Sequence, residues 1–279
     1  MKHPLGIVTW TLGLTAPRQV CARAQALGLD SIQYAGDHRD CDPAELAAQA
    51  ASAGLGILAI DPFNAGPAEP AKATEEGAIA YYRDVVDFAA RAGGVPVTLH
   101  GLSQWTRNCT GPTHARQRLL NCCKAVDGYA RERGVATLYE VCNHYEVPLI
   151  HTADACRKLI HDVGSDNLRM ILDSFHMNIN EKNPLETLRQ HAAFTAIYHI
   201  SDTGRGGIGT GHIDFGAQRQ ALAQGGFSGA VAIELVLPHL TPSTPPSTEL
   251  DHQALDEQVR HSAAFWRAAP MPEAYHVNG

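Results

Sequence analysis

The sequence lacks the features that mark several large classes of protein. It has no cluster of basic residues, and its 22 lysines and arginines are outnumbered by 29 aspartates and glutamates, which gives a net charge of −7. A protein with this negative net charge and no basic cluster binds a phosphate backbone poorly, so we expect no nucleic-acid partner. The start, "MKHPLGIVTWTLG", has no continuous apolar segment of the secretory type, and no window approaches the roughly 18 apolar residues of a membrane span. We therefore expect a soluble, cytoplasmic protein with no membrane partner.

Cysteine is present but not in the patterns of a disulfide framework or a zinc knuckle. The seven cysteines include no C-x-x-C pair, and only Cys122 and Cys123 lie close together in the sequence. An odd number of scattered cysteines indicates reduced, mostly buried thiols.

The chain does contain eight short apolar runs, each followed by an alanine- and leucine-rich stretch of helical type. The runs are "LGIVTW" (5–10), "SIQYAG" (31–36), "GILAID" (56–61), "VPVTLH" (95–100), "ATLYEV" (136–141), "RMILDS" (169–174), "TAIYHI" (195–200) and "AVAIEL" (230–235). Strands that are apolar on both faces are typical of buried parallel sheets. Eight such units predict a single (β/α)8 TIM barrel over residues 1–279, a length close to the usual size of about 250 residues.

A doubly wound open sheet is the alternative fold. No G-x-G-x-x-G follows the first predicted strand and no Walker loop occurs, so the main sequence support for that fold is missing. Among the helices, 152–164 has Thr152 as its expected N-cap and Gly164 as its expected end. The stretch "LPHLTPSTPPST" (237–248) predicts a long loop after the eighth strand, before a C-terminal helix at about 249–268.

Four polar residues terminate the last four predicted strands. They are Glu140, Asp173, His199 and Glu234, and successive members are separated by 33, 26 and 35 residues, about one strand–helix unit each. The C-terminal ends of barrel strands converge on one face, so these side chains can meet there. Three carboxylates so close together would repel unless a cation lay among them. Oxygen ligands with one imidazole favour one divalent metal, for which we expect Mn²⁺, with Mg²⁺ or Co²⁺ as alternatives.

The segments "EVCNHYE", "LDSFHMNI", "HISDTGR" and "GHIDF" carry a resemblance to a known family. Between about residues 135 and 235 the sequence is similar to the sugar isomerase/epimerase superfamily of xylose-isomerase-like barrels, and within it to the ketose 3-epimerases of the D-tagatose and D-allulose type. The resemblance implies that Glu140, Asp173, His199 and Glu234 bind one metal and that Glu140 and Glu234 also act as acid and base. It further implies that Glu146, His176 and Arg205 hydrogen-bond the O1 to O3 end of the sugar.

The chemistry of these residue types agrees with that implication. A keto sugar that loses its C3 proton develops negative charge, which a metal and an arginine fork can stabilise. Deprotonation by one carboxylate and reprotonation by another inverts C3. His176 could instead orient Asp173, and Glu146 could cap a helix. Trp105 in "GLSQWTRN" is either a stacking wall for the sugar or a packing residue.

The sequence departs from the family at the second strand, and it leaves other functions open. Many relatives carry a carboxylate where this chain has Gln33 and Tyr34. The alternatives that share the metal set are an aldose–ketose isomerase and a lyase, either a keto-inositol dehydratase or a 3-keto-glycoside deglycosidase. An abasic-site endonuclease, which shares the barrel, would need extra histidine ligands for a multi-zinc site and a basic face, and a barrel that only binds sugar would not need two acid/base groups. The expected partner is a small-molecule sugar, and a homo-oligomer remains open.

Overall fold

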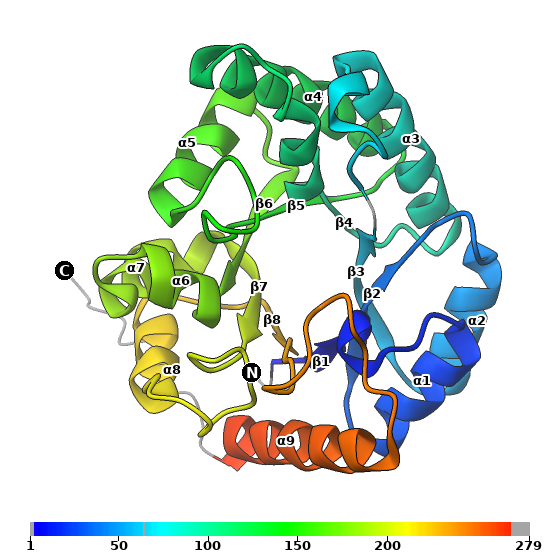
Figure 1. Ribbon diagram of the computed structural model, residues 1–279, viewed down its shortest axis with the longest axis vertical. Coiled ribbons are helices and arrows are strands. Elements are labelled where there is room, and N and C mark those ends of the chain that lie inside the picture. Colours follow the sequence, from blue (N-terminus) through cyan, green and yellow to red (C-terminus); the bar gives the residue numbers. More distant parts are fainter. Residues whose placement is uncertain (1–2, 64, 269–279) are drawn as a thin grey trace.

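Eight parallel strands form a closed barrel, as the sequence predicts (Figure 1). The computed structural model describes residues 3–63 and 65–268; the predicted domain also includes residues 1–2, 64 and 269–279, which lie outside the described residues. Each strand pairs with the next, and the last pairs with the first. The strands are β1 (Leu5–Val8), β2 (Ser31–Gly36), β3 (Gly56–Pro62), β4 (Val97–Thr98), β5 (Thr137–Glu140), β6 (Leu168–Asp173), β7 (Thr195–Ile200) and β8 (Ala230–Ile233).

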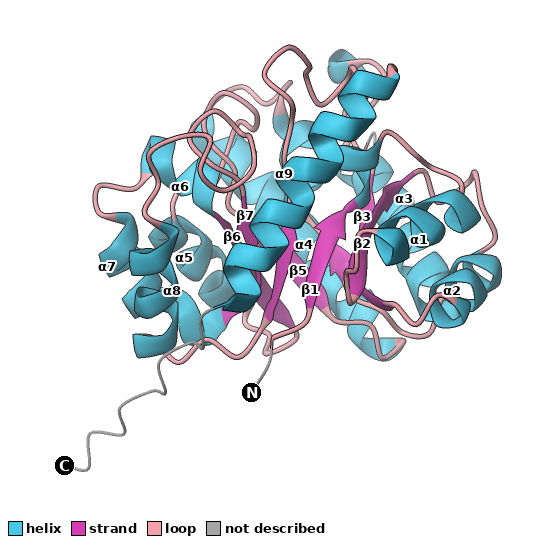
Figure 2. Ribbon diagram, turned by 90° about the horizontal axis from the view of Figure 1, so that it is seen from below, coloured by secondary structure: helices cyan, strands magenta, loops and turns pink. Residues whose placement is uncertain are grey.

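The helices form a ring around the barrel, and Figure 2 shows α9 crossing its outer surface. They are α1 (Pro17–Ala26), α2 (Pro43–Ser52), α3 (Glu75–Arg91), α4 (Pro112–Glu132), α5 (Ala153–Val163), α6 (Ser174–Asn180), α7 (Pro184–His191), α8 (Phe215–Gln224) and α9 (Glu249–Ala268). Four short 3-10 helices are η1 (Thr9–Leu12), η2 (Pro70–Lys72), η3 (His100–Thr106) and η4 (Ala192–Phe194). No helix within the described ranges is long and apolar enough to cross a membrane.

Apolar side chains cover both faces of the sheet, and the strand sequences are therefore unbroken apolar runs. One cluster lies inside the barrel and consists of Val8, Ala35, Ala59, Leu138, Ile171, Ile197 and Ala232. A much larger cluster fills the space between the strands and the surrounding helices. Burial on both faces therefore explains the pattern that predicted a parallel barrel.

Local signals fix several helix ends. The hydroxyl of Thr152 accepts a hydrogen bond from the Ala155 N–H, and Gly164 ends α5 with a φ of 74°. Both were predicted, because a threonine side chain satisfies a free N–H and glycine tolerates the left-handed region. All seven cysteines are free thiols, which confirms the reading of their scattered pattern.

Four of the strands, β1, β4, β5 and β8, are shorter than their apolar runs. Pro96 has no N–H to donate, so regular pairing of the fourth run begins at Val97, and His100 already opens η3. The first run ends as a strand at Val8, and Trp10 lies on η1. Both turns occur at the C-terminal ends of strands, where they bring side chains over the barrel mouth.

The stretch 237–248 is a loop, as predicted, and it leads into α9. Thr248 and Asp251 cap the start of that helix through reciprocal hydrogen bonds between backbone and side chain. Pro245 packs closely against Gly13, which has a φ of 66°. The loop is therefore held against the segment that follows β1.

Candidate active site

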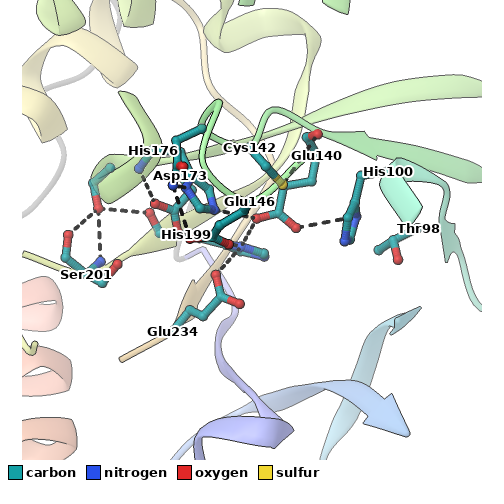
Figure 3. Close-up of polar contacts among 12 residues, drawn as sticks. Thr98, His100, Glu140, Cys142, Glu146, Asp173, His176, His199, Ser201 and Glu234 are labelled. Atoms are coloured by element: carbon teal, nitrogen blue, oxygen red, sulfur yellow. Dashed lines mark hydrogen bonds and ion pairs between the residues drawn. The ribbon is translucent and has the colours of Figure 1, made fainter. Parts of the chain in front are cut away.

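The four strand-end residues meet at the C-terminal mouth of the barrel (Figure 3). Glu140 and Asp173 end β5 and β6, His199 is the penultimate residue of β7, and Glu234 directly follows β8. All four are buried, and each offers one ligand atom within 4.8 Å of the others. The predicted convergence is thus present, and binding of a metal there stays a prediction.

His199 lies at the centre of this group. Its Nδ1 is 3.1 Å from Oε2 of Glu234 and 3.3 Å from Oε1 of Glu140. Its other ring nitrogen, Nε2, lies 2.8 Å from Oε1 of Gln33. The Gln33 carbonyl can therefore accept a hydrogen bond from the Nε2–H and fix the ring with Nδ1 toward the carboxylates.

The two carboxylate oxygens of Asp173 have different surroundings. Oδ1 accepts a hydrogen bond of 2.9 Å from the backbone N–H of His176 and so caps α6. Oδ2 is buried and has no hydrogen-bond partner among the described residues. Burial and the nearby Glu234 raise the pKa of this carboxyl well above its usual range. A buried carboxylate oxygen without a donor is the kind of group that a cation would satisfy.

The charges of the cluster also favour an added cation. Burial lowers the pKa of His199, but Glu140 and Glu234 outweigh burial and raise it well above its usual value. Burial alone would raise the pKa of Glu234, yet His199 and Arg205 hold it below the ordinary range. The positive charges of His199 and Arg205 thus stabilise the ionised form of Glu234. Three oxygen donors and one imidazole nitrogen fit a divalent metal ion such as Mn²⁺, Mg²⁺ or Co²⁺.

Arg205 reaches the site from the loop after β7. Its NH1 lies 2.6 Å from Oε1 of Glu146, its NH2 lies 3.9 Å from Oε1 of Glu234, and its buried Nε has no partner among the described residues. The guanidinium lies beside the rings of Phe175 and Trp10, 5.1 and 5.5 Å from their centroids. The residue has a φ of 65°, a left-handed conformation that costs about 1–2 kcal/mol outside glycine. Arg205 lines the cavity above the cluster, and its guanidinium is well suited to bind a negatively charged oxygen there.

His176 also points into the site, on the side of Glu140. Its Nδ1 lies 2.8 Å from the Asn143 amide nitrogen, and its Nε2 lies 3.7 Å from Oε1 of Glu140. Burial lowers the pKa of His176, so the neutral ring with its proton on Nε2 fits these contacts. The amide nitrogen of Asn143 is also 3.1 Å from Glu146, so one side chain positions two of the predicted sugar-binding residues.

Trp105 is not brought to this group. It is 9% exposed, its indole N–H donates to the carbonyl of Ala65, and its ring lies beside Tyr81. It does not line the cavity described below, and its position is that of a packing residue. The sequence could not separate the two readings, because a tryptophan in a loop has the same local signal in both.

A cavity of about 320 Å³ opens above the cluster. It is lined by Trp10, Asp61, Pro62, Phe63, Ala65, Gly66, His100, Gly101, Gln104, Glu140, Cys142, Glu146, Val147, His176, Arg205, Glu234 and Pro242. A hollow of about 480 Å³ lies elsewhere, between α5 and the start of β6, and contains none of the predicted site residues. The smaller cavity is therefore the candidate substrate-binding site.

The sequence profile of the family described as "Xylose isomerase-like TIM barrel" matches residues 21–269. The chain belongs to this family. Among curated members, an L-ribulose 3-epimerase of Mesorhizobium japonicum is 29% identical over 263 residues, which cover 88% of this chain and 80% of that protein.

Solved structures agree in fold. The D-psicose 3-epimerase from Clostridium cellulolyticum H10, determined with D-tagatose, has a TM-score of 0.82 and 22% identity, and the match covers 97% of this chain and all of that one. An L-ribulose 3-epimerase has a TM-score of 0.80 and 26% identity, with 95% of this chain and 93% of that one covered. The family membership and these relatives identify the protein as an enzyme of the sugar epimerase and isomerase type.

Several cavity residues were not predicted from the sequence. Asp61 and His100 end the apolar runs "GILAID" and "VPVTLH", so the strand-end reasoning used for the last four strands would have found them in the third and fourth. Trp10 also ends its apolar run, "LGIVTW", but it is not an acid or a histidine, so a search for such residues at strand ends does not select it. In the sequence Gln33 stands only as a departure from the family pattern, and its contact with His199 depends on the closed barrel.

Proposed function

We propose that the enzyme epimerises a free 2-keto sugar at C3. The observation that carries the proposal is the convergence of Glu140, Asp173, His199 and Glu234 at one cavity, which is lined by Glu140, Glu234 and Arg205. The relatives named as L-ribulose and D-psicose 3-epimerases support the same reaction. A cavity of about 320 Å³ suits a single monosaccharide.

We propose that one divalent metal, Mn²⁺ or alternatively Mg²⁺ or Co²⁺, is held by Glu140, Asp173, His199 and Glu234. The unpartnered Oδ2 of Asp173 and the raised pKa of His199 support this assignment. When bound, the ion would supply Lewis-acid stabilisation of the negative charge that develops on the sugar when C3 loses its proton.

Glu140 and Glu234 are the proposed acid/base pair. Each directs one oxygen to Nδ1 of His199 and has its other oxygen facing other groups of the cavity. A sugar held between them would give its C3 proton to one carboxylate and take a proton from the other, which inverts the carbon. The reverse assignment serves the reverse reaction.

Arg205, His176 and Glu146 are proposed to hold the sugar at its O1 to O3 end. The Arg205 Nε–H and the His176 Nε2–H are donors for oxygens on which negative charge develops. Glu146 is an acceptor for a hydroxyl and also holds the guanidinium through its 2.6 Å contact. Trp105 is left out of the proposed binding site because of its position.

Proton exchange in D₂O tests the proposal. The chelator-stripped enzyme, reloaded with Mn²⁺, is incubated with D-psicose, D-fructose, L-ribulose and D-tagatose, and exchange at each carbon is followed by NMR. We expect deuterium at C3 together with the C3 epimer. Exchange at C1 with an aldose product would instead establish an aldose–ketose isomerase. A keto-inositol and a 3-keto-glycoside are incubated in parallel, and loss of a β-substituent from either would establish a lyase.

A further inference from the structure

A second group of ligand-type side chains adjoins the four strand-end residues. His100, Glu140 and Cys142 each offer one ligand atom, and these three atoms lie within 4.8 Å of one another. Glu140 belongs to both groups: its Oε1 lies 3.3 Å from Nδ1 of His199, and its Oε2 lies 3.6 Å from Nδ1 of His100. Figure 3 shows His100 on the side of Glu140 that is away from His199. The carboxylate of Glu140 therefore bridges two sites.

The distance between His100 and Glu140 is not that of a hydrogen bond. At 3.6 Å the contact is too long, and Nδ1 of His100 is buried without any hydrogen-bond partner among the described residues. Two ligands of one tetrahedral ion, each bonded at 2.0–2.2 Å, lie about 3.4 Å apart. The separation of the two atoms thus fits two ligands of a shared ion.

The opposite edge of the His100 ring faces a carboxylate. Its Nε2 lies 4.0 Å from Oδ1 of Asp61, which is longer than a hydrogen bond, and Asp61 is itself held by a hydrogen bond from the hydroxyl of Thr98. A histidine that binds metal through one nitrogen commonly presents the other to a carboxylate, which orients the ring. His199 also presents its Nδ1 to carboxylates, but its Nε2 lies within hydrogen-bond distance of a neutral amide oxygen, that of Gln33.

We propose a second divalent-metal site formed by Nδ1 of His100, Sγ of Cys142 and Oε2 of Glu140, with Asp61 as the residue that positions His100. Three protein ligands leave one position of a tetrahedral ion for water or a sugar hydroxyl. The sulfur and nitrogen ligands favour Zn²⁺ or Co²⁺ here, whereas the oxygen-rich neighbouring site favours Mn²⁺ or Mg²⁺. The two sites therefore differ in the metal that they select.

Occupancy of the second site would inhibit epimerisation. An ion on Oε2 withdraws electron density from the Glu140 carboxylate and makes it a weaker base for the C3 proton. Activity would then rise with the first equivalent of metal and fall with the second when the second is Zn²⁺. This consequence depends on the proposed epimerase function, but the binding of the second ion does not.

Metal stoichiometry with Co²⁺ tests the site directly. Chelator-stripped full-length protein is dialysed against Co²⁺, and bound metal is counted by mass spectrometry while the near-ultraviolet band of a sulfur–cobalt bond is recorded. We expect two ions per chain and the band. Cys142→Ser should lose the band and one ion, and His100→Gln should lose one ion. Asp173→Asn should lose one ion but keep the band.

The control variant is Cys109→Ser, which replaces a cysteine that does not line the cavity and should retain two ions and the band. Circular dichroism confirms that each variant is folded. His100 is 23% exposed, so His100→Gln decides the question if replacement of the buried Cys142 prevents folding. One ion per chain without the band in the wild type would overturn the site, as would two ions and a band that persist in both variants. Two ions in a protein that exchanges no ketose proton even with a single equivalent of Mn²⁺ bound would leave the second site standing and remove the epimerase proposal.

Discussion

The indole Nε1 of Trp10 donates a hydrogen bond of 2.8 Å to Oε1 of Glu234, so the segment after the first strand contacts the residue after the last. The contact exists because β1 pairs with β8 and closes the barrel. It gives one of the two proposed acid/base carboxylates a fixed donor on the side away from His199.

Replacement of Trp10 by Phe should therefore weaken catalysis and shift its pH dependence. A hydrogen bond to a charged group is worth about 1.5–3 kcal/mol, so kcat/KM should fall roughly 10- to 100-fold. The lost donor stabilised the ionised carboxyl, so the pKa of Glu234 should rise and the acidic limb of the pH profile should move to higher pH. Trp105→Phe is the matched control, because its N–H binds the Ala65 carbonyl away from the cavity, and it should change stability without moving the pH profile.

Glu140→Gln and Glu234→Gln should each lower kcat by roughly 10² to 10⁴, because an amide cannot accept the C3 proton. The two variants should differ in which of the two substrate epimers still exchanges deuterium with solvent, as measured by NMR. Glu146→Gln is the matched comparison, since Glu146 is proposed to bind the sugar and not to move its proton, and it should mainly raise KM. Near-wild-type turnover in both Glu140→Gln and Glu234→Gln would rule out the two-carboxylate mechanism.

Removal of metal should lower the melting temperature and abolish activity. An ion present at 100 times its Kd stabilises the folded state by about 2.7 kcal/mol. For domains of 150–250 residues each kcal/mol shifts the melting temperature by roughly 2–4 °C, so chelation should cost several degrees. The measurement is a thermal melt with and without chelator, and an activity that survives chelation contradicts the metal assignment.

The stabilisation that bound metal gives the folded protein should depend on pH. Without metal, burial and Glu234 raise the pKa of Asp173, and the carboxylates raise that of His199 against the effect of burial. Above the usual carboxyl range the folded state then binds more protons than the unfolded chain, so its stability falls as the pH rises through the raised pKa values. Bound metal competes with those protons, so the stabilisation by metal should grow with pH. Melting temperatures between about pH 5 and 8, with chelator and with Mn²⁺, should therefore show a gap that widens as the pH rises; a constant gap would contradict the assignment.

The loop 237–248 should contribute to the substrate entrance. Pro242 lines the cavity, and Pro245 packs against Gly13. Replacement of residues 239–247 by a short Gly/Ser linker removes both contacts and frees the backbone, so KM should rise and the melting temperature should fall. Pro242→Ala separates the cavity contact from the stiffness of the loop. Unchanged kinetics with an unchanged oligomeric mass would show that the loop is only a connector.

The sequence by itself determined the barrel and the four residues that meet at its mouth. Strands buried on both faces must be almost wholly apolar, so a polar residue that terminates each of them, as Glu140 and Asp173 do, is visible in the one-dimensional pattern. Parallel strands then place such residues on one face without any further information. The helix ends at Thr152 and Gly164 are local for the same kind of reason, because a cap is made within one turn.

Only the tertiary structure decided which groups touch one another across the barrel. The contact of Gln33 with His199 joins β2 to β7, and the contact of His100 with Glu140 joins η3 to β5; both distances depend on the stagger and side-chain packing of the closed sheet. The burial of Trp105 and the left-handed turn at Arg205 depend on loops, whose course is set by packing rather than by a repeating pattern. Strand periodicity therefore reveals where polar groups gather, while the pairing of their individual atoms is fixed only when the barrel closes.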